Sequence, residues 1–209
     1  GVVVGRVLAV AQTYSERTQA ACARCLRNLS RYPEAHGALV REGALQTLVM
    51  MVMVRSAKSE TMHHSAAALL NLISATHLER MLEEGVCQAF SELAAGEHGE
   101  GTLAVCARAF CALSCHAGGR RRLAERPSAL RGLLSLARSP EPDTKINCCR
   151  ATCNLLLYKE SRAPACRGGA LQALKVLGVQ DQLPECQRRS PAALAVVASD
   201  PACRARLVA

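Results

Sequence analysis

The stretch TQAACARCLRNLSRYPEAHGALVREGAL, residues 18–45, contains the landmarks that recur along the whole chain. Gly43 opens an apolar run, GALQTLVMMV, and a Gly or Pro opens a similar run every 42 residues. Asn28 lies in the motif RNLS, and related motifs follow at steps of 43, 41, 42 and 42 residues. Periods of this length indicate stacked helical repeats, in which a single repeat cannot bury its apolar face alone.

Two sets of landmarks define the register of the repeat. The apolar runs begin at Gly1, Gly43, Gly85, Pro127 and Gly169. The second landmark falls at Asn28, Asn71, Ala112, Asn154 and Val196. The register gives repeats at residues 1–42, 43–84, 85–126, 127–168 and 169–209, of which the first and last are partial. We therefore expect one solenoid domain over residues 1–209, cut from a longer array.

Each repeat is predicted to contain three helices. The first is short, the second follows the Gly, and the third is the longest and ends at the Asn landmark. The Gly suits a sharp turn between helices because positive φ is easiest without a Cβ atom. Pro127 instead fits the first turn of a helix. In the third helix the residues three and six before the landmark are small, as at Cys25 and Cys22, which lets neighbouring helices approach closely.

This order of helices, with Gly-Ala opening the second and Asn-Leu ending the third, resembles the armadillo repeat. The resemblance covers the whole chain and implies an all-α, right-handed armadillo-type α-solenoid of about five three-helix repeats. HEAT repeats are similar, but they usually have two helices and lack these landmarks. In armadillo proteins the third helices line a concave groove, where the Asn holds the main chain of an extended peptide.

The composition agrees with helices and with an acidic partner. Half of the residues are hydrophobic but only 2% are aromatic, so the core must consist of Leu, Val, Ala and Cys. Basic residues exceed acidic ones by 26 to 17, and all but four of the basic residues are Arg. Arg favours planar, bidentate partners such as carboxylates and phosphates. No run of 18 apolar residues and no signal-peptide pattern occurs, which predicts a soluble protein without membrane insertion.

The twelve cysteines raise the question of a disulfide framework or a zinc site, with Cys22 and Cys25 as the best-spaced pair. Cys22, Cys106 and Cys148 share one position of the repeat with Ser65 and Ser190. Cys at that position is therefore interpreted as a small buried residue, and no metal is expected. Reduced thiols imply the cytoplasm or the nucleus. Cys111 and Cys153 are expected to be more accessible.

Two pairs, His63-His64 and Cys115-His116, could suggest catalysis. Neither has an orienting carboxylate or a nucleophile at a recognisable spacing, and the chain has no glycine-rich phosphate loop. We therefore expect no catalytic residue, no enzyme activity, no cofactor and no small-molecule substrate. The run Arg120-Arg121-Arg122 in a first helix is interpreted as a solvated face, with nucleic-acid binding as the alternative.

The third helices carry the candidate binding residues. In nuclear-import receptors, which the family includes, a Trp four residues before the Asn forms a pocket for a basic side chain. That position here holds Arg24, Ala67, Arg108, Arg150 and Ala192. Four residues are about one helical turn, so each Arg lies beside its landmark on the same face. The expected groove residues are Arg24, Asn28, His64, Asn71, Arg108, Asn147, Arg150, Asn154 and Arg189.

These residues predict a non-catalytic scaffold that binds an extended, acidic peptide, with Asn on its backbone and Arg on its carboxylates. This resembles the catenin mode more than the import-receptor mode. Two alternatives stay open: a nucleic-acid-binding repeat surface using the same Arg residues, and a structural array within a larger protein. The simplest interpretation of the Arg residues is that they only keep an exposed face soluble.

The last third helix carries a Pro near its centre. Pro191 removes one backbone donor, and its ring clashes with the preceding turn, which costs ~3 kcal/mol. Ser190 and Pro191 together would make a plausible cap and first turn. The sequence therefore predicts a regular helix only over residues 190–199, with residues 184–189 kinked or separate.

Overall fold

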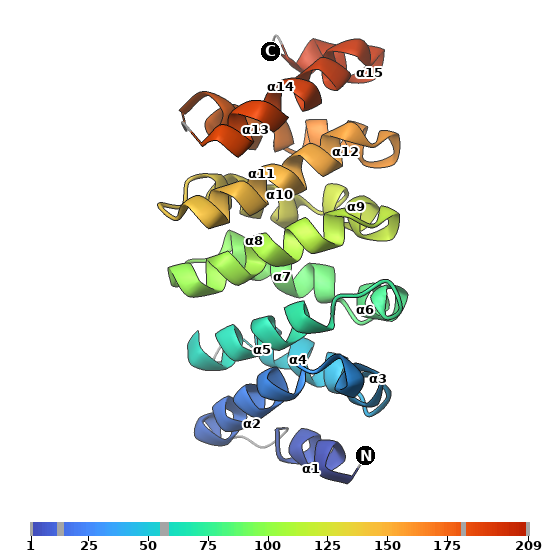
Figure 1. The fold of residues 1–209 in the computed structure, drawn as a ribbon, viewed down its shortest axis with the longest axis vertical. Helices are drawn as coiled ribbons and strands as arrows, with labels where there is room; N and C mark the ends of the chain where they lie inside the picture. Colours follow the sequence, from blue (N-terminus) through green and yellow to red (C-terminus); the bar gives the residue numbers. More distant parts are fainter. Residues whose placement is uncertain (1, 12–14, 55–58, 181–182, 208–209) are drawn as a thin grey trace. The chain divides into compact units, whose positions relative to one another are not determined.

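The structure, a computed structural model, describes residues 2–11, 15–54, 59–180 and 183–207 (Figure 1). Within these ranges the regular secondary structure is helical and contains no strand, which confirms the all-α prediction. The chain divides into two compact units, Gly1–Ala89 and Phe90–Ala209, here called unit 1 and unit 2. Each is described by itself, and the single domain over residues 1–209 stays a prediction.

The three helices of each repeat follow the expected order. The first helices are α3 (Pro33–Arg41), α6 (Leu78–Glu83), α9 (Ala117–Ala124), α12 (Lys159–Arg167) and α15 (Pro201–Arg204). The second helices are α1 (Val2–Ala11), α4 (Ala44–Met53), α7 (Val86–Ala95), α10 (Pro127–Ala137) and α13 (Ala170–Lys175), and α13 continues as a π-helical segment (Val176–Gln180). The third helices are α2 (Glu16–Leu29), α5 (Ser59–Leu72), α8 (Glu100–Ser114), α11 (Pro142–Leu157) and α14 (Pro184–Ser199). A 3-10 turn (Ala205–Leu207) follows α15.

The corners between first and second helices have the predicted backbone. Gly43, Gly85 and Gly169 have φ angles of 90°, 84° and 104°, a region that a side chain makes unfavourable. Pro127 lies in the first turn of α10, where its missing N–H group costs nothing. Gly1 lies outside the described residues. The glycine landmark thus marks a left-handed residue at three corners.

The small position of the third helix is buried in both units. Cys22, Ser65, Cys106, Cys148 and Ser190 are all buried, as the register predicted. The Cys148 Sγ atom lies 3.2 Å from the Leu133 carbonyl oxygen of α10. Burial raises the pKa of the Cys106 and Cys148 thiols well above the usual range. These cysteines act as structural residues.

Two expectations about cysteine accessibility were only partly right. Cys111 is half-buried, as expected, but Cys153 is only 1% exposed, so the expectation for Cys153 was wrong. Cys153 lies in α11 where this helix packs on α14, and the neighbouring helix covers it. The exposed thiol of this region is Cys115, which follows α8.

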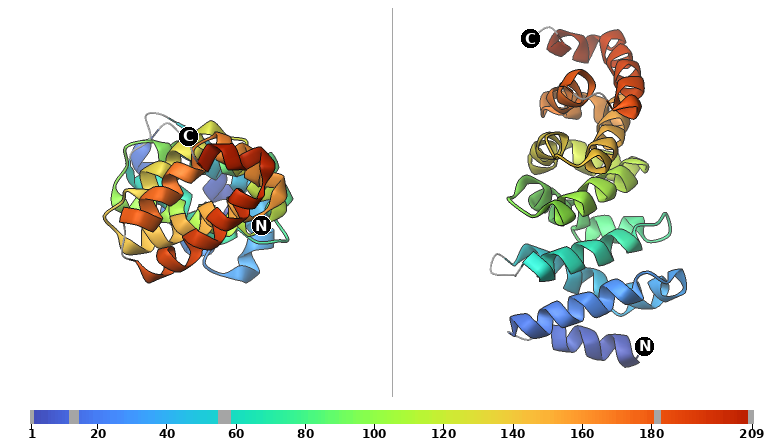
Figure 2. Two further views of the ribbon diagram at one scale, coloured as in Figure 1. Left: turned by 90° about the horizontal axis from the view of Figure 1, so that it is seen from above. Right: turned by 60° about the vertical axis from the view of Figure 1, so that its left-hand side comes forward.

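The third helices pack on one another within each unit. In unit 1, α2 lies against α5, and in unit 2, α11 lies between α8 and α14 (Figure 1). Figure 2 shows the unit 2 helices from a second side, in yellow-green, orange and red. The first helices of unit 2 pack in the same succession, with α12 contacting α9 and α15. Corresponding positions of consecutive repeats are therefore brought together.

The prediction for Pro191 was wrong, because α14 is helical from Pro184 to Ser199. The helix buries Cys186, Ser190, Ala193 and Val197, a stripe at helical spacing that faces α11. Pro191 itself is exposed, and so is Gln187, whose carbonyl lacks the helical partner that Pro191 cannot supply. Water can solvate that carbonyl, while packing of the buried stripe holds the helix together.

Candidate functional site

The three Arg residues of the predicted register lie in different surroundings. Arg24 on α2 and Arg108 on α8 are exposed, and neither has a hydrogen-bond or ion-pair partner within the described part of the chain. Arg150 on α11 is half-exposed, and its Nε atom donates to Glu185 Oε1 of α14 at 3.2 Å. Two of the three guanidinium groups are therefore open to solvent, and the third already holds a carboxylate.

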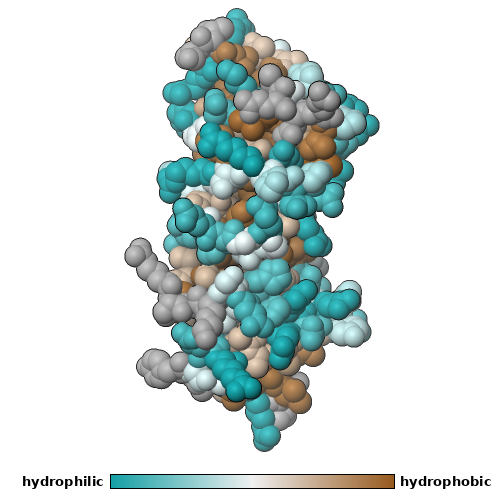
Figure 3. Space-filling model, turned by 90° about the vertical axis from the view of Figure 1, so that its left-hand side faces the viewer, coloured by the Kyte–Doolittle hydropathy of each residue, from teal (hydrophilic) through white to brown (hydrophobic). Residues whose placement is uncertain are grey.

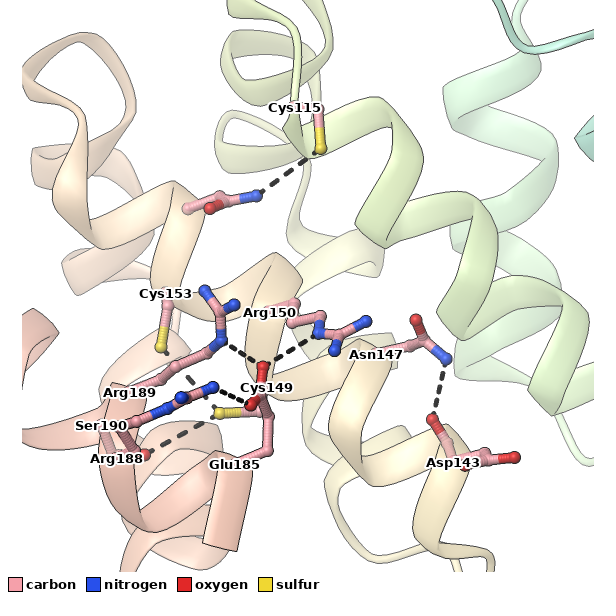
Figure 4. A network of polar contacts seen from close by, with 11 residues as sticks. Cys115, Asp143, Asn147, Cys149, Arg150, Cys153, Glu185, Arg188, Arg189 and Ser190 are labelled. Carbon is pink, nitrogen blue, oxygen red and sulfur yellow. Dashed lines mark hydrogen bonds and ion pairs between the residues drawn. The ribbon is translucent and has the colours of Figure 1, made fainter.

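Glu185 gathers three Arg residues into what we call the Arg cluster: Arg150, Arg188, Arg189 and Glu185 (Figure 4). Arg189 donates from Nε to Glu185 Oε1 at 2.6 Å, and Arg188 donates to the other carboxylate oxygen. The hydrogen bond from Arg189, followed by those from Arg188 and Arg150, lowers the pKa of Glu185 to about 2. The same contact raises the pKa of Arg189. Glu185 is thus a firmly ionised anchor among three cations.

Asn71 and Asn154 take part in the same two-bond relay, one in each unit. Asn71 Nδ2 donates to Ser30 Oγ at 3.1 Å, and Ser30 Oγ donates to the Arg27 carbonyl at 2.9 Å. The corresponding distances in unit 2 are 3.0 Å from Asn154 to Ser114 and 2.8 Å from Ser114 to the Cys111 carbonyl. Because the Ser proton is already donated to a carbonyl, the Ser oxygen must accept from the Asn. The relay therefore fixes which way each amide faces and leaves its oxygen available.

The other two amides of the predicted groove behave differently. Asn28 at the end of α2 is exposed. Asn147 Nδ2 donates to the Asp143 carbonyl of its own helix at 2.8 Å, so this amide is tied to α11. Asn147 is drawn beside Arg150 in Figure 4.

His64 lies between two helices of unit 1. Its Nδ1 atom is 3.2 Å from Arg27 Nη1, and its Nε2 atom is 3.5 Å from Glu60 Oε1. Because a guanidinium can only donate, Nδ1 must accept, and the ring is the neutral tautomer with its proton on Nε2. Burial, and then the charge of Arg27, lower the pKa of both His63 and His64. His64 therefore contributes an uncharged contact to this face at neutral pH.

Four of the first helices bind the end of the preceding third helix through the same geometry, whereas α6 has Glu79 at the donor position. A side chain eight residues after the landmark donates to the carbonyl two residues after it. The pairs are His36 with Ser30 at 2.8 Å, Arg120 with Ser114 at 3.1 Å, Arg162 with Leu156 at 2.7 Å and Arg204 with Ala198 at 2.9 Å. These donors satisfy carbonyls that the helix ends would otherwise leave unpaired.

Arg120 corrects the interpretation of the Arg120-Arg121-Arg122 run as a solvated face. Its side chain is buried, forms an ion pair with Glu160 at 2.7 Å and stacks 3.7 Å from the centre of the Tyr158 ring. Arg121 and Arg122 are exposed, as expected. The sequence run hid one structural Arg among two surface ones, because helical periodicity turns successive residues to different faces.

In the described part of the chain no three His, Cys, Asp or Glu side chains lie together as metal ligands. A surface pocket of about 510 Å³ is lined by Lys159, Arg162, Ser199 and Asp200, among others. Its polar groups are engaged, since Arg162 pairs with Asp200 at 2.8 Å and Ser199 donates to the Ala195 carbonyl. This geometry lacks an activated nucleophile.

Several residues of this surface were not identified from the sequence. The Ser partners of the relay carried a signal, because Ser30 and Ser114 both stand two residues after the landmark. The donors of the first helices carried another, since Arg120, Arg162 and Arg204 recur every 42 residues. Glu185 stands eleven residues before its landmark, where two other repeats also have an acid, Glu60 and Asp143. The register therefore offered a signal for an acid at this position, but not for its contact with Arg150. That contact is found only from the approach of α14 to α11.

Polar residues dominate the face drawn in Figure 3, with smaller hydrophobic areas between them. No helix of the described residues combines the length and the apolar character needed to cross a membrane.

Comparison with known proteins identifies the fold. No family profile matches the sequence, and no curated protein matches it either. The chain is similar to computationally designed armadillo repeat proteins for modular peptide recognition, with 20% identity, a TM-score of 0.79, and coverage of 93% of this chain and 82% of the other. A designed armadillo repeat protein in complex with the peptide (KR)4 has 20% identity, a TM-score of 0.76, and coverage of 92% and 81%. An armadillo-repeats-only protein from Plasmodium falciparum has 15% identity, a TM-score of 0.69, and coverage of 86% and 80%.

Proposed function

Because the chain has the armadillo-repeat fold, we propose that it is a non-catalytic protein-interaction scaffold whose third helices hold an extended, acidic segment of a partner. The reduced, buried cysteines fit a cytoplasmic or nuclear protein. In this proposal Arg side chains bind the carboxylates of the partner, and Asn amides bind its backbone.

The observation that carries the proposal is the ion pair between Arg150 and Glu185. It places a carboxylate from a neighbouring element against an Arg of the predicted register. Arg24 and Arg108 stand at the same register, are exposed, and have no partner within the described residues. A carboxylate of a partner would give them the contact that Glu185 gives Arg150.

The relay supports binding of a peptide backbone. Asn71 and Asn154 each use one N–H group on a Ser, and Asn154 Nδ2 also lies 4.0 Å from Cys115 Sγ. Each amide keeps its oxygen as an acceptor, and that of Asn71 also keeps a second N–H group. An extended peptide presents one acceptor and one donor per residue, and a fixed amide can bind both. Because the amides are already oriented, less side-chain entropy would be lost on binding.

The Arg residues of the third helices do not suit a basic peptide such as (KR)4, with which one of the similar designed proteins was solved. That peptide consists of basic residues, and a basic partner would be repelled by Arg24, Arg108 and Arg150. The shared fold therefore supports binding of an extended chain, and the Arg residues favour the opposite sign of charge.

The test is a charge reversal of the two unpartnered Arg residues, Arg24→Glu with Arg108→Glu. Arg150 is left intact, because reversing it would also disturb the contact with Glu185. Binding of a fluorescently labelled Asp/Glu-rich peptide is followed by anisotropy, and each lost charged contact should weaken it by about tenfold or more. Binding by the wild type should also weaken as salt rises.

The matched control is Arg121→Glu with Arg122→Glu, which makes the same change in net charge on α9. This control should bind the acidic peptide almost as the wild type does. Equal loss in both double variants would mean that the peptide senses only net charge, and the proposed surface would be wrong. Stronger binding of a single-stranded RNA oligonucleotide through the same two Arg residues would favour the nucleic-acid alternative.

A further inference from the structure

The Arg cluster carries more positive charge than its own carboxylate neutralises. Three guanidinium groups, of Arg150, Arg188 and Arg189, surround the single carboxylate of Glu185, which leaves a net charge of 3 − 1 = +2. The side chains of the three Arg residues are 43%, 74% and 40% exposed. An anion arriving from solvent can therefore reach them, and it meets an excess of positive charge.

The geometry of the Arg cluster leaves the terminal Nη groups of two Arg residues free. Arg150 and Arg189 both bind Glu185 through Nε. Their paired terminal Nη nitrogens point away from the carboxylate in Figure 4. This pair is the fork with which Arg binds an anion in a bidentate manner. Glu185 thus fixes two guanidinium groups and leaves both forks available.

We propose that Arg150 and Arg189 bind a phosphoryl group on the extended partner, as in a phosphoserine peptide. A phosphoserine has three terminal oxygens and a charge of about −1.5 to −2 at neutral pH, which matches two forks and the charge excess. A carboxylate has two oxygens and one charge, so it can occupy only one fork fully. The inference rests on the proposed function, because the phosphate arrives as part of a bound peptide.

The number of charges and of free oxygens also distinguishes a phosphorylated peptide from a nucleic acid. A phosphodiester in RNA has a single negative charge and two free oxygens, so it resembles a carboxylate in what it can offer these forks. The described third helices also carry few aromatic residues, consistent with the 2% aromatic content of the chain, which single-strand binding generally needs. The phosphomonoester is therefore the ligand that the cluster fits best.

The experiment compares three versions of one acidic peptide with the whole chain by fluorescence anisotropy. The central residue is Ser, phosphoserine, or a pair of Asp residues that matches the phosphate in charge. We expect the phosphoserine peptide to bind about tenfold or more tightly than the Ser peptide, and more tightly than the Asp peptide. Equal binding of the phosphoserine and Asp peptides would overturn the proposal in favour of charge alone.

Two double variants test the forks. Arg150→Gln with Arg189→Gln should abolish the preference for phosphoserine, whereas Arg121→Gln with Arg122→Gln should preserve it. Arg150→Lys with Arg189→Lys retains the charge but removes the forks, so it should also lose most of the preference. Helical circular dichroism and the melting temperature of each variant confirm that it is folded. A Lys variant with the full preference would contradict the bidentate geometry.

The possible failures can be told apart. Binding of all three peptides without a preference would overturn the phosphate site and leave the acidic-peptide scaffold standing. Binding of none of them would overturn both proposals. Tighter binding of a single-stranded RNA oligonucleotide, lost in the Gln double variant, would assign the cluster to nucleic acid.

Discussion

Unit 1 and unit 2 form two equivalent contacts with different side chains. At the end of a third helix, His36 binds the carbonyl in unit 1, whereas Arg120 does so in unit 2. Seven residues before the landmark, unit 1 has His64 and unit 2 has Arg189. In both places unit 1 uses an imidazole and unit 2 uses a guanidinium.

The replacement of imidazole by guanidinium changes the charge of each contact and its dependence on pH. Arg120 and Arg189 are permanently charged. Arg120 pairs with Glu160 of the next repeat, whereas Arg189 pairs with Glu185 of its own helix. His64 has an equivalent carboxylate four residues earlier, Glu60 at 3.5 Å, but its ring is neutral and also accepts from Arg27. One repeat architecture therefore accommodates an ionic junction in unit 2 and a largely neutral one in unit 1, and only the neutral one depends on mild changes of pH.

The largest expected effect distinguishes the two kinds of helix-end contact. Arg120→Met removes a buried cation together with its bonds to Ser114 and Glu160, which should reduce the free energy of unfolding by ~2–3 kcal/mol. His36→Ala removes one half-buried hydrogen bond and should cost ~1 kcal/mol. Urea unfolding measures both. Equal losses would mean that the ionic junction adds nothing to the carbonyl contact.

The left-handed corners should be equivalent in the two units. Gly85→Ala and Gly169→Ala should each lower the free energy of unfolding by ~1–2 kcal/mol, because both residues have positive φ. A Cβ atom would meet nothing within 4 Å at either site, so the cost comes from backbone strain and not from a clash. Gly99→Ala is the control, since Gly99 has a φ of −62° and equally open surroundings. Its stability should change by less than about 0.5 kcal/mol. A similar loss at Gly99 would remove the strain argument.

The relay should also be equivalent in the two units. Double-mutant cycles of Ser30→Ala with Asn71→Ala, and of Ser114→Ala with Asn154→Ala, should each give a coupling energy of ~1 kcal/mol. The two cycles rest on distances of 3.1 Å and 3.0 Å. Coupling in only one unit would show that the relay is not a general feature of the repeat.

The smallest expected effect is the change in stability of each unit as the pH falls. His63 and His64 have folded pKa values below the ordinary 6.5, so the unfolded chain binds protons first as the pH falls. Their stabilisation is therefore complete above pH 6.5 and is lost below it. Glu185 behaves differently, since its contribution is present above its ordinary pKa of 4.5 and is lost as the pH falls through about 2.

Hydrogen exchange at about pH 7.5 and pH 5.5 measures this contrast. The amides of α5 should lose protection at the lower pH, while those of α14 should not. In a variant with His63→Gln and His64→Gln the difference between the two pH values should shrink. Equal loss of protection in α5 and α14 would contradict the assignment of the pH dependence to unit 1.

The sequence predicted the features that repeat. The period, the three helices of a repeat, the left-handed Gly43, Gly85 and Gly169, and the buried Cys22 position all follow from residues that recur in register. Each of them is determined by local geometry or by a position that every repeat must bury. The armadillo-repeat fold could therefore be recognised from the sequence.

Features that depend on one particular contact could not be predicted. Pro191 was expected in the first turn of a helix over residues 190–199, with residues 184–189 kinked or separate, but tertiary packing of its neighbours outweighed the local penalty. Arg120 and Cys153 were expected on the surface, and both are covered by elements of the next repeat. The register predicted Arg24, Arg108 and Arg150 as equivalent positions. Only the approach of α14 to α11 shows that, among these three and within the described residues, Arg150 is the one that meets a carboxylate.

The relay limits how such a chain can be lengthened or shortened by duplication. Along the sequence, the residue two after one landmark and the next landmark form the pairs Ser30 with Asn71, Ile73 with Ala112, Ser114 with Asn154, and Leu156 with Val196. In the sequence, polar and apolar pairs therefore alternate. Deleting one repeat would place a Ser before an Ala or Val, or Ile73 before Asn154, whereas deleting two consecutive repeats would restore a matching pair. The unit that can be added or removed while keeping matching pairs is thus two repeats, about 84 residues. We expect insertions and deletions in such a chain to change the number of repeats by an even number.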